Sequence, residues 1–222
     1  MPSLPNRCLL SLAAAAWLAI ASPSSSRGAT LASEDAAMLD ALATLLFNVE
    51  EGKPIFPDDD PVTRQVSGNA IDHRYVEPSP LFGSTDPQYK DESASKYRRV
   101  RYEFRLSAPC VIRVENTAEN SQGDSKQTFG LNVRKSVSVF DLRNHRQFEF
   151  HMSTPIMGGV AMKGDKILCT GSDGSQQCFD EYTHPVVMPA GVKASDSERA
   201  SFAAHKLEAA QTVTKRCPGR SG

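Results

Sequence analysis

The sequence lacks a charge excess of either sign. Its 222 residues carry 25 Lys and Arg against 26 Asp and Glu, which gives a formal net charge of −1. This balance argues against a nucleic-acid-binding protein driven by bulk charge. Gly and Pro, at 14 each, are near average usage, and 40% of residues are hydrophobic. A collagen, a coiled coil and a wholly disordered tail are therefore excluded, and the length fits one domain with short additions.

Catalytic and cofactor motifs are also lacking. The chain contains no G-x-S-x-G, H-E-x-x-H, C-x-x-C, glycine-rich phosphate loop or EF-hand loop, and its five histidines do not have metal-ligand spacing. We therefore expect neither a cofactor nor a metal site. An enzyme is the less favoured interpretation.

One long apolar run is present, close to the N-terminus. Residues 8–21 form 14 consecutive positions without a charge, and small residues follow up to Ala29. A membrane-spanning helix needs about 20 apolar residues, so the run is short for a span and fits the core of a secretory signal peptide. We interpret residues 1–29 as a signal peptide, cleaved between 21 and 29, of a protein exported to the periplasm or the extracellular space. An uncleaved N-terminal anchor is the alternative, and no membrane span is expected after signal removal.

The remaining chain divides into three parts. Residues 30–51 contain an N-terminal helix over 33–48, with Ser33 as its N-cap and apolar residues at helical spacing. Residues 52–95 hold six prolines and few aliphatics, without a sustained period. They are interpreted as an acidic, proline-rich loop or partly disordered segment. Residues 96–222 form the folded body.

Alternating patterns in the folded body predict antiparallel strands. Residues 99–106 place Val100, Tyr102, Phe104 and Leu106 on one side, with Arg and Glu between them. Further strands are expected at 110–114, 133–142, 147–152 and 178–187, and a short hairpin over 158–170 around Lys163, Gly164 and Asp165. A final helix begins at Ser195, where Ser195 and Glu198 have capping-box spacing. The fold class is α+β: a curled antiparallel sheet of about six or seven strands with an N-terminal helix and a C-terminal capping helix.

Four cysteines follow the signal peptide, and an even number in an exported chain implies disulfides. Asp173-Gly174 is a strong two-residue hairpin turn, and counting outward from it places Cys169 opposite Cys178. The facing Cα atoms of a non-hydrogen-bonded pair lie about 4.5 Å apart, within disulfide range. Cys110 and Cys217 remain as the second pair. A metal site of Cys169, Cys178 and His184 is the alternative, although the spacing lacks the usual knuckle.

Arginines give the best candidate binding residues. Arg99, Arg101 and Arg105 share one face of a predicted strand, and guanidinium groups on a strand can hold carboxylates, phosphates or sulfates. The alternative is a solvated outer face that pairs with the acidic segment 52–95.

Three functional hypotheses remain open. The first is an exported binding or accessory protein whose partner is an anionic ligand or an envelope protein. The second is a periplasmic hydrolase that uses His151 or His184 with a carboxylate; His151 would share its strand face with Glu149. The third is a structural component of the cell envelope whose acidic loop orders on a partner.

The cysteine pattern predicts the thiol content of the native protein. Material from its native compartment should show no alkylatable thiol without reductant and four after denaturation and reduction, because all four sulfurs after residue 29 are paired. Mass spectrometry after alkylation measures this count. Four free thiols in unreduced protein would contradict both the pairing and the export.

Overall fold

The computed structural model describes residues 31–55, 59–78, 97–120, 132–172, 175–189 and 194–219. The signal peptide and the turn at Asp173-Gly174 lie outside these ranges. The described elements are α1 (Ser33–Phe47), β1 (Thr63–Ser67), β2 (Ala70–Pro78), β3 (Tyr97–Ala108), β4 (Val111–Asn120), β5 (Asn132–Asp141), a 3-10 turn η2 (Leu142–Asn144), β6 (His145–Thr154), β7 (Met157–Ser172), β8 (Ser175–Val187) and α2 (Asp196–Arg216). Within the described ranges, neither helix has the length and apolarity needed to cross a membrane.

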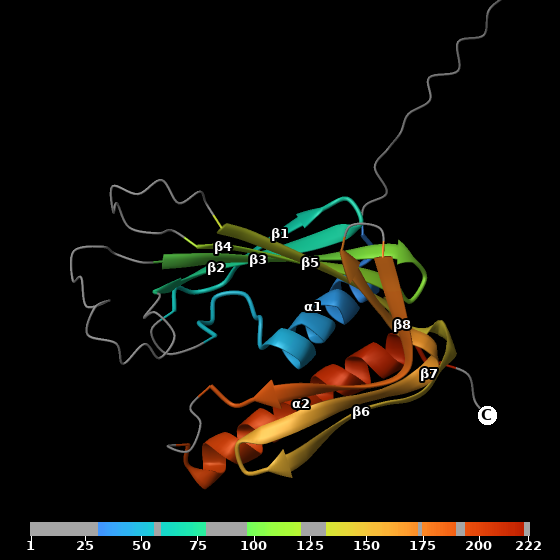
Figure 1. Ribbon diagram of the computed structural model, residues 1–222. Helices are drawn as coiled ribbons and strands as arrows, with labels where there is room; N and C mark the ends of the chain where they lie inside the picture. The colour runs from blue at the N-terminus through green and yellow to red at the C-terminus, as the bar shows by residue number, and fades with distance from the viewer. Residues whose placement is uncertain are drawn as a thin grey trace, which may run out of the picture.

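The strands form one antiparallel sheet in the order β1-β2-β3-β4-β5-β7-β6, and β8 pairs with β7. The sheet bends sharply along β7 and β8, so that it has two layers with the helices between them (Figure 1). The first layer contains β1 to β5 and the ends of β7 and β8 near their shared turn. The second contains β6 and the rest of β7 and β8. The α+β prediction is confirmed, with eight strands where six or seven were expected.

The bend lies within β7, which pairs with three strands. Residues 157–164 pair with β6, and residues 168–171 pair with β5, while β8 follows the other edge. The β7–β8 register shifts between Lys163 and Leu168, and Lys166 has a positive φ of 48°. A bulge of this kind increases local twist and turns a strand. The bend therefore allows one strand to serve both layers.

The predicted hairpin over residues 158–170 is wrong, because β7 continues through Lys163, Gly164 and Asp165 without reversing. Gly164 lies against the 3-10 turn, and a Cβ atom there would come within 2.8 Å of the Asn144 carbonyl oxygen. Glycine at this position is therefore explained by close backbone approach and not by a turn.

The interpretation of residues 52–95 as a loop is wrong for residues 63–78, which form β1 and β2. Ile71 and Tyr75 point into the core, but His73 lies between them on the same buried face. That buried histidine interrupts the apolar alternation. The short edge strand β1 is mostly exposed and carries little apolar signal.

Both helices bury their apolar faces between the layers. Helix α1 packs beneath β2 and β3, α2 packs on β6, and the two helices contact each other. The capping box of Ser195 and Glu198 on α2 is confirmed. On α1, Ala32 and not Ser33 is the N-cap residue, and no side-chain capping bond forms there. The main core contains Met38, Leu39, Leu42, Leu45, Phe104, Ile112, Val160, Met162 and Val213.

Both predicted disulfides are present. Cys169 and Cys178 face each other across β7 and β8 with their Cα atoms 4.0 Å apart, and the register continues to Ser172 opposite Ser175 as counted from the turn. Cys110 and Cys217 join the β3–β4 turn to the end of α2, at a sequence separation of 107. The alternative metal site is wrong, because both of its thiols are in a disulfide.

Phe104 is the largest fully buried side chain among the described residues, and its ring contacts those of Phe47 and His73. Phe104→Ala should lower the free energy of unfolding by about 3–5 kcal/mol, because it leaves a cavity between α1 and the first layer. Urea unfolding measures the change. Val66→Ala, at an exposed β1 position, is the control and should change stability by less than about 0.5 kcal/mol. Equal losses in the two variants would contradict this assignment of the core.

Candidate functional site

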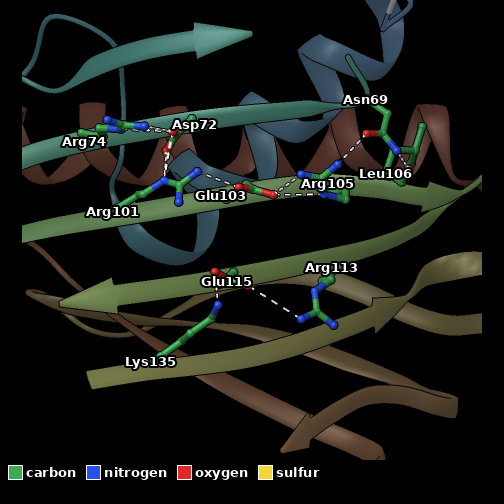
Figure 2. A network of polar contacts seen from close by, with 10 residues as sticks. All are labelled: Asn69, Asp72, Arg74, Arg101, Glu103, Arg105, Leu106, Arg113, Glu115 and Lys135. Carbon is green, nitrogen blue, oxygen red and sulfur yellow. Dashed lines mark hydrogen bonds and ion pairs between the residues drawn. The ribbon is translucent and has the colours of Figure 1, made fainter. Parts of the chain in front are cut away.

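The outer face of the first layer, turned away from the helices, carries rows of charge that cross the strands. One acidic row follows from the register: Asp72 on β2 faces Glu103 on β3, which faces Glu115 on β4. Basic residues lie two positions away along the strands on either side of this row (Figure 2). One basic row contains Arg74, Arg101 and Lys135, and the other contains Arg105 and Arg113.

Like charges that face each other across strands destabilise a sheet. Here ion pairs between the rows, some along one strand and some diagonally across two strands, offset this repulsion. Arg101 donates to both Asp72, at 2.9 Å, and Glu103, at 2.7 Å, and Arg74 approaches Asp72 to 2.6 Å. Burial raises the pKa of Asp72, but hydrogen bonds from Arg74 and Arg101 outweigh it and hold that pKa below its usual value. The Asp72 carboxylate therefore stays ionised and fixes the side chains of Arg74 and Arg101.

A depression of about 460 Å³ lies at one end of this face. Three arginines line it: Arg74 from β2 and Arg99 and Arg101 from β3. Val76 supplies apolar surface, and Thr117 adds a hydroxyl. The remaining lining residues are Asp60, Pro61, Thr63, Tyr75 and Val100. A lining of several cationic side chains with some apolar surface is typical of a site for a small anion-bearing ligand.

The structure separates the three arginines predicted from the sequence. Arg99 and Arg101 line the depression, whereas Arg105 lies beyond the acidic row and bonds to Glu103 and Asn69. The alternative hypothesis, that these arginines pair with the acidic segment 52–95, is confirmed for Arg101, because its partner Asp72 belongs to that segment. Arg74 was missed because residues 63–78 were interpreted as a loop. Its position between His73 and Tyr75, in an alternating stretch, was the sequence signal that could have indicated a strand there.

The histidines proposed for hydrolysis do not form a His–carboxylate pair with the predicted partner. His151 is exposed and its ring lies beside Gly159, while the Glu149 carboxylate accepts a hydrogen bond from Gln147 at 2.7 Å. His184 donates from Nε2 to the Leu46 carbonyl oxygen at 2.9 Å. Burial lowers the pKa of His184. His184 is thus a neutral residue that joins β8 to the end of α1.

Two polar clusters beneath the first layer, the first partly buried and the second buried, had not been predicted. In the first, Asp40 on α1 accepts two hydrogen bonds from Arg64 Nε and Nη2 and lies 3.3 Å from His73 Nε2. Burial raises the pKa of Asp40, but hydrogen bonds from His73 and Arg64 outweigh it and lower that pKa. This cluster attaches α1 to β1 and β2. Among the described residues, no group of three or more metal-ligating side chains lies close enough to hold an ion.

The second cluster contains Lys206 on α2, whose side chain is only 1% exposed. Its ammonium group donates to the Thr44 carbonyl oxygen near the C-terminal end of α1 and lies 5.3 Å from the centre of the Phe202 ring. Burial lowers the pKa of Lys206 to about 8. The Thr44 carbonyl also accepts from the Asn48 N–H, so the lysine adds a second donor to it and places a cation at the negative end of the α1 dipole.

Comparisons of the whole chain with protein-family models, with curated proteins and with solved structures found no match. The functional argument therefore depends on the geometry of the chain itself.

The buried lysine predicts how stability depends on pH. Between pH 8 and about 10.5 the unfolded chain holds a proton that the folded chain has released, so this group makes stability rise with pH. Lys206→Met should therefore raise the free energy of unfolding at pH 7 by about 3 kcal/mol, and the gain should shrink toward pH 10. Urea unfolding at both pH values measures it. Lys215→Met, at an exposed position of the same helix, is the control, and equal pH slopes in the two variants would contradict the prediction.

Proposed function

We propose that this protein is an exported binding protein that holds an anionic ligand in the depression lined by Arg74, Arg99 and Arg101. The observation that carries the proposal is that three arginines, from two adjacent strands, line one depression of about 460 Å³. Groups on strands are held more rigidly than groups on loops, which reduces the entropy lost when a ligand binds.

The ion pairs of Arg74 and Arg101 leave donors for a ligand. The contacts to Asp72 and Glu103 use the Nε and Nη2 atoms of Arg101, and those to Asp72 use the same two atoms of Arg74. A guanidinium has five N–H donors, so each arginine keeps donors that these bonds do not use. A carboxylate, phosphate or sulfate accepts such donors in pairs. Asp72 and Glu103 hold Arg74 and Arg101 in place, while both arginine side chains stay partly exposed.

The export part of the proposal is supported by the two disulfides and by the apolar run near the N-terminus. Disulfides form and persist in oxidising compartments and are rare in the cytosol. A periplasmic or extracellular site of action follows, where the ligand would be an anionic metabolite or an anionic group of the envelope.

Paired substitutions on one sheet face test the site. Arg99→Gln with Arg101→Gln removes two charges inside the depression, and Arg105→Gln with Arg113→Gln removes two charges outside it. The wild-type protein should be retained on phosphocellulose at low salt although its net charge is −1, because retention depends on a local surface. The first variant should elute at clearly lower salt than the second. Circular dichroism confirms that each variant is folded.

Equal elution of the two variants would show that retention depends on the charge of the whole face and not on the depression. Failure of the wild-type protein to be retained would contradict the proposal directly.

A further inference from the structure

The two disulfides differ in their exposure. Cys178 is exposed and Cys169 is half-buried, and the pair lies on the outer face of the first layer. Cys217 is only 1% exposed and belongs to the core beside Val213, although its partner Cys110 is half-buried. An external thiolate must reach a sulfur atom in order to break a disulfide, so exposure controls the rate. Cys178 is the most exposed of the four disulfide-bonded cysteines.

The place of Cys169–Cys178 in the sheet is unusual for a structural crosslink. The Cα atoms lie 4.0 Å apart, below the usual range of about 4.4–6.8 Å, because the two residues face each other directly in adjacent strands. The two cysteines of this crosslink have a sequence separation of only 9, against 107 for the other disulfide, so the loop that it closes is short. A bridge across so short a loop restricts the unfolded chain less. Its loss should therefore affect the fold less than loss of Cys110–Cys217.

The strands around Cys169–Cys178 are held together without it. The β7–β8 register continues on both sides, from Leu168 opposite Phe179 to Ser172 opposite Ser175. On its other edge, Cys169 pairs with Val139 of β5. Backbone hydrogen bonds therefore keep the two cysteines facing each other when the bridge is open, so that it can close again without refolding.

From exposure, register and loop length together, we infer that Cys169–Cys178 is a thiol–disulfide exchange site that an external dithiol opens while Cys110–Cys217 stays closed. A thiolate of the dithiol attacks Cys178 Sγ, the disulfide bond breaks, and Cys169 leaves as a thiolate that takes up a proton. The second thiol of the reagent attacks the mixed disulfide and releases Cys178. The protein gains two electrons and two protons, and the dithiol is oxidised to its own disulfide. This inference does not depend on the proposed anion site.

Timed reduction of the folded protein tests the inference. The protein is incubated with dithiothreitol without denaturant, samples are quenched with N-ethylmaleimide, and peptide mass spectrometry identifies which cysteines are alkylated. Thiols at Cys169 and Cys178 should appear at least about 100-fold faster than thiols at Cys110 and Cys217, since access limits the attack. The circular dichroism spectrum should stay native while the first pair opens.

The variant Cys169→Ser with Cys178→Ser is the control, because it keeps the core disulfide. It should fold and should lose the fast phase completely. A fast phase that persists in this variant, equal rates for the two pairs, or prior opening of Cys110–Cys217 would each overturn the inference. Unfolding of the wild-type protein as soon as the first pair opens would overturn it as well, because the bridge would then be structural.

Discussion

The bend in β7 is the constraint on which the rest of the structure depends. This strand pairs with β6 over one half, with β5 over the other, and with β8 along its second edge. The register shift before Leu168 turns the strand, and the two layers then enclose α1 and α2 (Figure 1). The two layers are thus joined by a continuous strand and are not two separate sheets. A single hydrophobic core lies between them.

The outer face of the first layer shows how the sheet organises charge. Side chains alternate between faces, so every second residue of β2, β3 and β4 lies outside, and the register decides which charges become neighbours. A shift of one residue would send Arg101 and Glu103 into the core. The buried row of Ile71 and Phe104 excludes that shift, so the core indirectly fixes the arginine-lined depression. The candidate site is therefore a consequence of core packing.

The same register accounts for the contrast between the two disulfides. Cys169 and Cys178 face each other because of strand pairing, which the sequence encodes locally through a two-residue turn. Cys110 and Cys217 meet only after α2 has packed between the layers. Cys169–Cys178 therefore adds little to strand contacts that form without it. Cys110–Cys217 forms only in the complete fold and fixes the end of α2.

Local patterns in the sequence determined α1, α2 with its capping box, the alternation over residues 99–106 and both cysteine pairs, because each depends on neighbours along the chain or on elimination. Only the tertiary structure decided that β7 is continuous, that residues 63–78 form strands and that Arg74 joins Arg99 and Arg101. Those features depend on partners far away in sequence: Gly164 against Asn144, His73 against Asp40, and Arg74 opposite Arg101. From the local sequence alone, a buried histidine or a glycine at a backbone crossing predicts a loop or a turn. The contact that explains each residue is made by another part of the chain.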